Sequence, residues 1–292
     1  SRRRHTRYIS VTGVQTCALP IFHTNFHRYA EHYGAALVGR SIAAYLRWLH
    51  NRTACTVVPT QEMKQELDNL GFERVLLAGR GVDSKLFHPA ARSRGLRRQW
   101  GCGDDELVVL SVGRLAPEKA LDEFAATARN LRFGNGTMRI VIVGDGPLRR
   151  QLERRYPDVH FAGERHGSDL AVHYASADLF LFPSTTETFG NVVLEAMASG
   201  LAVVAYDEAA AKQHIIHAES GLLAAVGEKG IFNEMAGLAA RDRELRRGLA
   251  LAAREAVLPL TWDRAFRELE GALLDSLAST RLGDAEIGRA HV

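Results

Sequence analysis

Two basic side chains lie close to the predicted start of a helix, where a bound anion would suit them. The segment Ser111–Lys119 reads SVGRLAPEK, so Gly113 closes a strand, Pro117 suits a first helical turn, and Arg114 and Lys119 lie on either side of that start. Cations at a helix N-terminus oppose the helix dipole and cost stability unless an anion binds there. The spacing favours an anion site, and the alternative for Lys119 is a solvated helix face.

Two glutamates flank the start of another predicted helix, which follows a strand and the loop PSTTETFG. Glu187 lies in that loop, and Glu195 lies on the helix eight residues later. The amides that face outward at the helix start and could hold an anion are those of Phe189, Gly190 and Asn191. Glu187 could accept hydrogen bonds from sugar hydroxyls and Glu195 from a ribose. Ordinary helix-start and surface carboxylates explain both glutamates equally well.

A third loop, Val143–Pro147, reads VGDGP and superficially suggests a dinucleotide-binding fingerprint. The fingerprint requires a third glycine, but Arg149 occupies that position. Gly144 and Gly146 are therefore interpreted as a tight turn beside a ligand, and an NAD-dependent oxidoreductase is disfavoured.

Apolar strand-like runs, most of them continuous, alternate along the chain with segments of helical period. The runs predict strands at Cys55–Val58, Arg74–Leu77, Glu106–Val112, Met138–Val143, Val159–Phe161, Leu179–Phe182 and Leu201–Ala205. The segments between them predict helices at Thr60–Leu70, Pro117–Leu131, Pro147–Arg154, Ser168–Ala175 and Asn191–Ser199. This order is typical of an α/β fold with a doubly wound parallel sheet covered on both faces. The three loops above would lie at its carboxyl edge, where such sheets bind nucleotides and phosphates.

Both ends of the chain are compatible with inverted copies of one DNA segment. Thr16–Ile21 can be written ACGTGTGCTCTTCCGATC, and its reverse complement, beginning at the last base of the Glu286 codon, reads Ile-Gly-Arg-Ala-His into Val292. This DNA resembles a sequencing-library adapter, so residues 1–21 and 286–292 are interpreted as adapter artefact. The alternative, a natural basic leader SRRRHTR, lacks a start methionine and a hydrophobic core.

The basic balance of the chain comes from these two ends. The 292 residues hold 37 Lys and Arg against 34 Asp and Glu, a net charge of +3. The ends contain five of the basic residues and one of the acidic ones, so residues 22–285 carry 32 against 33, a net charge of −1. This balance removes the global argument for a nucleic-acid or membrane partner, and no nucleic-acid partner is expected. No apolar run approaches the roughly 18 residues of a membrane-spanning helix, and the cysteines lack metal-site spacing.

The remaining sequence divides into three predicted parts. Residues 22–89 read as the remnant of an α/β domain with the turn-rich connection GRGVDSKLFHP, residues 90–258 as a complete α/β domain, and residues 259–285 as a C-terminal helix. Because the chain starts abruptly at Phe22, we expect an upstream piece of the first domain to be missing.

In combination, these motifs resemble glycosyltransferase family 4. They are Glu-x7-Glu at Glu187 and Glu195, GR-x4-K at Arg114 and Lys119, and GDGP at 144–147. The resemblance extends from Phe22 to about Leu277, and the stretches FHTNFHRY and GRGVD are closest to GDP-mannose-dependent α-mannosyltransferases and plant-type sulfoquinovosyltransferases. It implies a GT-B fold, in which two Rossmann-like domains with parallel sheets face each other across a cleft. The N-terminal domain would be incomplete here.

The resemblance also implies roles for individual residues. Arg114 and Lys119 would bind the donor diphosphate and stabilise the departing nucleotide, Glu187 would contact the donor hexose, and Glu195 would hold the ribose. Further donor-binding positions would be Gly113, Gly144, Gly146 and the amides of Phe189, Gly190 and Asn191. His23 matches the family's N-domain histidine near the reacting carbon, although that residue taken alone is better explained as a structural histidine. Base recognition would use backbone groups near Phe161–His166.

The implied reaction moves a hexose, most simply mannose from GDP-mannose, to a lipid or glycan acceptor with retention of configuration. GT-B enzymes need no metal and the sequence has no Asp-x-Asp loop, so no metal or cofactor is expected. Because most of the acceptor half is missing, we expect the chain itself to be inactive. The alternatives are a UDP-sugar-dependent glucosyl- or sulfoquinovosyltransferase, a sugar-nucleotide epimerase of the same fold, and a non-catalytic nucleotide-sugar-binding module.

One apolar cluster suits peripheral contact with the inner face of a membrane in an otherwise cytoplasmic protein. It consists of Tyr45, Leu46, Trp48 and Leu49, with Arg40 and Arg47 nearby. A buried helix face flanked by surface arginines explains the same residues, and this second interpretation is preferred.

Overall fold

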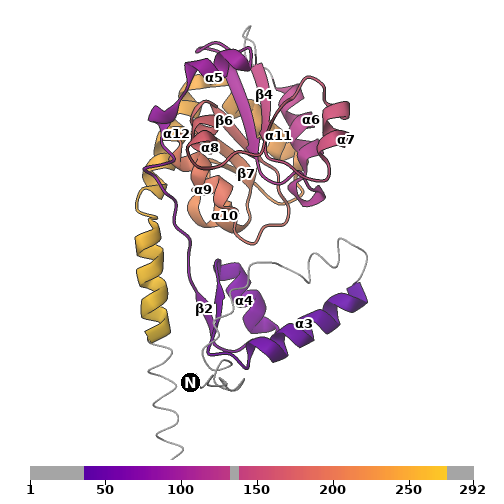
Figure 1. The fold of residues 1–292 in the computed structure, drawn as a ribbon, viewed down its shortest axis with the longest axis vertical. Coiled ribbons are helices and arrows are strands. Elements are labelled where there is room, and N and C mark those ends of the chain that lie inside the picture. Colours follow the sequence, from indigo (N-terminus) through magenta and orange to yellow (C-terminus); the bar gives the residue numbers. More distant parts are fainter. Residues whose placement is uncertain (1–35, 132–137, 275–292) are drawn as a thin grey trace, which may run out of the picture. The chain divides into compact units, whose positions relative to one another are not determined.

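The computed structural model of the chain describes residues 36–131 and 138–274. They fall into two compact units: residues 80–264 form the larger, and residues 36–79 and 265–274 belong to the smaller (Figure 1). None of the helices in these described stretches has both the length and the apolar character that crossing a bilayer requires.

The smaller unit contains a short parallel β-α-β arrangement. Its elements are α3 (Ala36–His50), β1 (Thr56–Val58), α4 (Gln61–Asn69) and β2 (Val75–Leu77). β1 and β2 pair in parallel, and the Thr60 hydroxyl accepts a hydrogen bond from the Met63 amide, which caps the start of α4. Its small core consists of Val58, Met63, Leu67, Phe72 and Val75. The strands and helix predicted for this region are confirmed to within one residue at each end.

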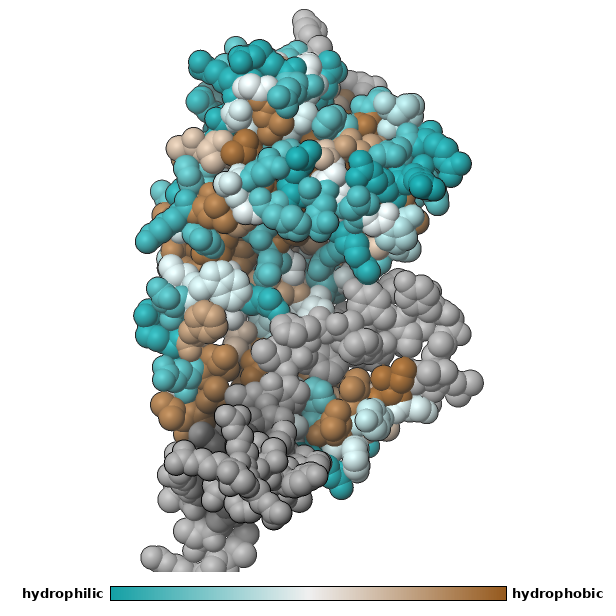
Figure 2. Space-filling model, viewed as in Figure 1, coloured by the Kyte–Doolittle hydropathy of each residue, from teal (hydrophilic) through white to brown (hydrophobic). Residues whose placement is uncertain are grey.

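The apolar cluster on α3 is not the buried helix face that the sequence favoured. Tyr45, Trp48 and Leu49 are exposed, by 60%, 52% and 41%, and only Leu46 packs against the small core. Figure 2 accordingly shows hydrophobic residues at the surface over α3. The guanidinium of Arg52 lies 4.0 Å from the centre of the Trp48 ring, a cation–π contact at the surface. The preference for burial was wrong because helical spacing groups side chains on one face without saying what covers it.

The larger unit is built on a six-stranded parallel sheet with the strand order β5-β4-β3-β6-β7-β8. The strands are β3 (Leu107–Val112), β4 (Met138–Val143), β5 (His160–Gly163), β6 (Leu179–Phe182), β7 (Ala202–Tyr206) and β8 (Leu222–Ala224). Every residue of β3, β6 and β7 is buried, as expected for unbroken apolar runs in a sheet covered on both faces. The predicted parallel α/β sheet is therefore confirmed, and β8 is a strand that the sequence analysis missed.

Helices pack on both faces of this sheet (Figure 1). They are α5 (Arg94–Gln99), α6 (Leu121–Asn130), α7 (Arg149–Arg155), α8 (Gly167–Ala175), α9 (Asn191–Ala198), α10 (Ala209–His214), α11 (Lys229–Arg241) and α12 (Arg243–Val257). One core layer joins α8, α9 and α10 to the side chains of Val108, Leu110 and Val112 of β3. The other joins α6, α7 and α11 to Leu107 and Val109 of the same strand. Alternate residues of each central strand thus serve opposite layers.

The predicted helix Pro117–Leu131 is interrupted. Pro117–Lys119 form one turn of 3-10 helix, Ala120 has a positive φ of 48°, and α6 begins only at Leu121. A left-handed alanine breaks the helical ladder, so Lys119 lies in a turn before the helix rather than in its first turn. The predicted boundary was therefore wrong by four residues.

The turns after β3 and β4 are packed backbone against backbone. The amides of Gly113, Leu115 and Leu148 donate to the carbonyls of Val143, Asp145 and Leu115 at 2.9–3.0 Å. A side chain at Gly144 would place its Cβ 1.9 Å from the Gly113 carbonyl oxygen, and one at Gly146 would lie 2.5 Å from that of Leu115. These two glycines are required by the close approach of the turns.

Gly144→Ala is expected to lower the free energy of unfolding by about 2 kcal/mol, because the turns must separate to admit a methyl group. Gly230→Ala is the matched control, since a Cβ there meets nothing within 4 Å and the position lies in the helix α11. Urea unfolding followed by tryptophan fluorescence gives the comparison. Equal stability of the two variants would contradict the steric argument.

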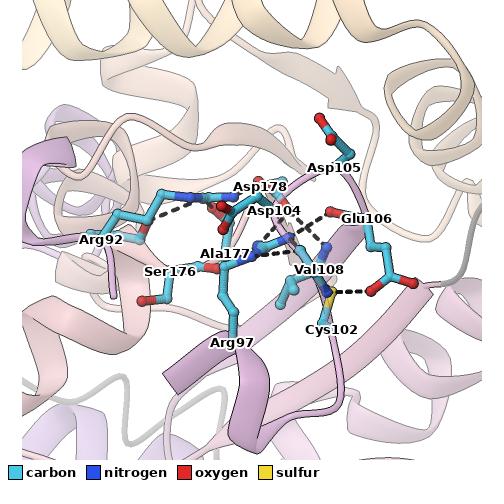
Figure 3. A network of polar contacts seen from close by, with 12 residues as sticks. Arg92, Arg97, Cys102, Asp104, Asp105, Glu106, Val108, Ser176, Ala177 and Asp178 are labelled. Atoms are coloured by element: carbon cyan, nitrogen blue, oxygen red, sulfur yellow. Dashed lines mark hydrogen bonds and ion pairs between the residues drawn. The ribbon is translucent and has the colours of Figure 1, made fainter. Parts of the chain in front are cut away.

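A buried ion network closes the opposite, amino edge of the sheet (Figure 3). Arg97 is fully buried and donates to Asp178 Oδ2 at 3.0 Å and to the carbonyls of Ser176, Gly103 and Glu106 at 2.6–3.0 Å. Asp178 also accepts from Arg92 and from the Val108 amide, both at 2.8 Å. This carboxylate therefore ties α5 and the start of β3 to the start of β6.

A cavity of about 270 Å³ opens beside this network. Its lining includes arginines of α12 and the acidic turn Asp104–Glu106. Its charges are of both signs, and Arg243 with Asp105 (3.5 Å) and Arg92 with Asp178 (2.8 Å) are already ion-paired.

Candidate functional site

The loops that carry the predicted site residues meet at the centre of the sheet. β3 and β6 are paired neighbours, and the loops after them hold Arg114–Lys119 and Ser184–Asn191. The helices after β3 and β4 cover one face of the sheet, whereas α9 and α10 after β6 and β7 cover the other. The winding therefore reverses between β3 and β6, and open α/β sheets bind ligands at the carboxyl end of such a switch point.

Lys119 and Glu187 form the central contact of this site. The Lys119 ammonium donates directly to Glu187 Oε1, and both side chains are mostly buried. The ammonium also lies 5.6 Å from the centre of the Phe182 ring at the end of β6. The structure thus brings together the cation and the carboxylate that the sequence motifs singled out 68 residues apart.

Arg114 is paired with a carboxylate that the sequence analysis gave no role. Its Nη2 lies 2.5 Å from Glu118 Oε1, and the Glu118 side chain is buried while Arg114 is exposed. Burial raises the pKa of Glu118, but the hydrogen bond and charge of Arg114, with the charge of Lys119, outweigh it and bring this pKa below its usual value. Each predicted cation therefore already has a carboxylate partner in the described structure. The four-residue spacing of Arg114 and Glu118 is the sequence feature that could have predicted this ion pair.

The start of α9 has the open amino end that the sequence predicted. Gly190 takes a left-handed φ of 88° at the N-cap, and no side chain caps the helix there. Phe189 is buried and packs edge-on against His214, with ring centres 6.0 Å apart, and the Arg80 guanidinium lies 5.9 Å from the Phe189 ring. The side-chain oxygen of Asn191 is buried without a hydrogen-bond partner among the described residues. Phe189 thus anchors the turn before α9 through its ring.

Glu195 lies on the second turn of α9, as predicted, and one of its oxygens is already engaged. The fully buried Tyr174 hydroxyl donates to Glu195 Oε2 at 2.9 Å. Burial raises the pKa of Glu195, and the Tyr174 hydrogen bond only partly opposes that rise.

The raised pKa of Glu195 implies that the stability of the protein depends on pH. The native state holds this proton more tightly than the unfolded chain, so the unfolding free energy should fall as pH rises from about 4.5 through the raised pKa. Glu195→Gln keeps an acceptor for Tyr174 and is expected to flatten that fall, whereas Glu255→Gln, at an exposed position of α12, leaves it unchanged. Urea unfolding at a series of pH values measures the slope, and identical slopes in the two variants would contradict the prediction.

The remaining predicted residues are three glycines in the turns after β3 and β4 and a histidine near the start of the chain. Gly113 closes β3, and a Cβ there would lie 3.9 Å from Lys119 Cε, so this glycine borders the site. Gly144 and Gly146 face the neighbouring turn, where their absence of side chains is used for packing. His23 lies outside the described residues, and so does the stretch FHTNFHRY.

Comparison with known proteins identifies the family. The family model for "Glycosyl transferases group 1" matches residues 106–241, which carry the loops described above. A GDP-mannose-dependent alpha-mannosyltransferase of Mycobacterium tuberculosis is 38% identical over 89% of this chain, which spans 66% of that relative's length. A second mannosyltransferase of that species, GDP-mannose-dependent alpha-(1-6)-phosphatidylinositol dimannoside mannosyltransferase, is 32% identical over 94% of this chain and 71% of its own length.

Solved structures agree on the fold. The crystal structure of Anabaena Alr3699/HepE in complex with UDP-glucose matches with a TM-score of 0.74 at 22% identity, covering 90% of this chain and 72% of that one. Sucrose-phosphate synthase from Thermosynechococcus elongatus matches with a TM-score of 0.72 at 23% identity, covering 91% and 68%. Both are GT-B glycosyltransferases. The chain therefore belongs to the glycosyl transferases group 1 family and has the α/β architecture of GT-B glycosyltransferases.

Proposed function

We propose that this chain carries the donor-binding domain of a retaining hexosyltransferase that moves mannose from GDP-mannose to a lipid or glycan acceptor. The observation that carries the proposal is the contact of Lys119 with Glu187 at the switch point of the sheet, with Arg114 on the same loop. This arrangement offers cations for a diphosphate immediately beside a carboxylate for sugar hydroxyls.

The reaction depends most on the groups around the leaving diphosphate. As the bond between the anomeric carbon and the diphosphate oxygen breaks, negative charge grows on that oxygen. Lys119 and Arg114 would stabilise this charge, and the open amino end of α9 adds its dipole. Glu187 would hold the hexose and Glu195 the ribose. Because the side chains supply the positive charge, the proposed transfer needs no metal ion.

The choice of GDP-mannose rests on the relatives. Three of them, from two mycobacteria and Corynebacterium glutamicum, are named GDP-mannose-dependent alpha-mannosyltransferases and are 32–38% identical to this chain. The Arabidopsis thaliana relative at 31% identity is named a sulfoquinovosyl transferase. The mannosyl donor is therefore favoured by the stronger similarity.

A lipid acceptor would require the enzyme to work at a membrane surface. The exposed Tyr45, Trp48 and Leu49 on α3 supply aromatic and aliphatic side chains, and Arg52 stacks on Trp48 beside them. Exposed aromatic side chains with adjacent arginines suit the headgroup region of an anionic bilayer. We propose that α3 contacts the membrane from the cytoplasmic side.

Calorimetric titration of the whole chain with GDP, UDP, GDP-mannose, UDP-glucose and NAD tests the proposal. Micromolar binding of GDP, unchanged by EDTA and weakened by Glu195→Ala, is the expected result. A preference for UDP would keep the family role and overturn the mannosyl donor. Failure of a folded sample to bind any of these nucleotides would overturn the proposed donor site.

A further inference from the structure

A buried serine contacts both loops of the proposed donor site, the one after β3 and the one after β6. Ser184 follows β6 after Pro183, is 2% exposed, and has its hydroxyl 2.8 Å from Glu187 Oε1 and 3.2 Å from the Glu118 carbonyl oxygen. A serine hydroxyl has one proton, so it can donate to only one of these acceptors at a time. The shorter contact, to a carboxylate, is the stronger.

The acceptor oxygen of Glu187 has two donors in the described structure, Lys119 and Ser184. The same ammonium is the group proposed to bind the donor diphosphate. A diphosphate carries more negative charge than one carboxylate, so its arrival would draw Lys119 away from Glu187. The Ser184 hydroxyl would then remain as the donor that holds Oε1 in place.

We propose that Ser184 is a positioning residue, which fixes the Glu187 carboxylate for the donor sugar while Lys119 turns to the diphosphate. This inference rests on the proposed function and adds to it the residue that separates sugar recognition from diphosphate recognition. With Oε1 held by Ser184, the other oxygen of Glu187 and the remaining lone pairs are available to sugar hydroxyls.

Ser184 also lies against the turn after β3. Its hydroxyl lies near the carbonyl of Glu118, whose side chain binds Arg114. The turn after β3 therefore packs against this serine, and a diphosphate bound by that turn would leave this contact in place. A freely rotating Glu187 would lose conformational entropy when it binds a sugar, and Ser184 removes much of that loss in advance.

The test compares two ligands that differ only in the sugar. The whole chain is titrated with GDP and GDP-mannose, or with UDP and UDP-glucose if it prefers uridine, and the ratio of the two Kd values is measured. Ser184→Ala is expected to weaken binding of the nucleotide sugar about tenfold and that of the free diphosphate less than about twofold. Ser184→Thr, which keeps the hydroxyl, should restore the ratio.

Ser199→Ala is the matched control. Ser199 is also a 2% exposed serine of the larger unit, but its hydroxyl has no partner among the described residues, and it lies at the far end of α9. It should leave the ratio unchanged. If Ser184→Ala does not fold, Ser184→Cys replaces it, because cysteine has a similar size and is only a weak donor. It is expected to weaken binding of the nucleotide sugar, relative to the free diphosphate, as Ser184→Ala would.

The outcomes distinguish failure of the positioning role from failure of the proposed function. Equal weakening of both ligands by Ser184→Ala, or no weakening of either, would overturn the positioning role while leaving the donor site intact. If the wild-type chain binds neither ligand, the proposed function itself fails and the role of Ser184 fails with it.

Discussion

Lys119→Ala is expected to weaken GDP binding about a hundredfold, the largest effect on affinity that the site predicts. The ammonium is mostly buried in the turn after β3, so its attraction to a phosphate is screened less than that of a surface lysine. Calorimetric titration of the whole chain with GDP measures the change.

Part of the lost GDP affinity would come from repulsion by Glu187. Lys119 neutralises Glu187, so its removal leaves a carboxylate beside the proposed diphosphate position. The alanine variant therefore loses an attraction and gains a repulsion. Lys119→Ala combined with Glu187→Gln removes the repulsion and should recover about tenfold of the affinity, a non-additivity expected of residues in direct contact.

Lys64→Ala is the control for this prediction. Lys64 forms an exposed ion pair with Asp68 on α4, at 2.7 Å, and its loss should change GDP affinity less than about twofold. Equal effects of the two lysine substitutions would show that Lys119 acts through general charge alone. A double variant no better than Lys119→Ala would contradict the repulsion from Glu187.

Most strands of the larger unit could be predicted because their sequences are rich in Val, Ile and Leu. Met138–Val143 and Leu179–Phe182 are apolar runs, interrupted only by Arg139, and their predicted bounds agree with β4 and β6. A parallel sheet covered on both faces needs such runs, and once the order of strands and helices is known, its loops must gather at one edge. This is why Lys119 and Glu187 could be assigned to one site from residues far apart in the sequence.

The features that the sequence could not predict depend on local backbone geometry and on contacts with residues distant in the sequence. Ala120 adopts a left-handed conformation, which alanine rarely does, so nothing in its identity signalled the break before α6. Leu222–Ala224 is too short to stand out as β8, and its place is set by pairing with β7. Ser184 belongs to a loop motif of small polar residues, and only the fold shows that its hydroxyl reaches Glu187.

The amino edge of the sheet offers the largest expected effect on stability. Asp178 accepts hydrogen bonds from two arginines and from the Val108 amide, and one of the arginines, Arg97, is fully buried. Breaking such a pair by removing one partner leaves an uncompensated charge in the interior, which costs more than the lost contact itself.

Asp178→Ala is therefore expected to lower the free energy of unfolding of the larger unit by about 3–5 kcal/mol. Asp158→Ala is the control: it breaks an exposed pair with Arg129, at 3.1 Å, and should cost less than about 1 kcal/mol. Urea unfolding measures both, and the buried Trp100 reports on the larger unit because Trp48 and Trp262 are substantially exposed.

The double variant Arg97→Met with Asp178→Ala distinguishes the charge from the contacts. If the cost comes mainly from the stranded guanidinium, removing the guanidinium as well should make the double variant more stable than Asp178→Ala alone. If the cost comes instead from the hydrogen bonds that Arg97 makes to the carbonyls of Ser176, Gly103 and Glu106, the double variant should be the less stable one. Because those carbonyls belong to segments next to β3 and β6, the second result would mean that Arg97 holds the two central strands together through their backbone, and Asp178 only fixes its orientation.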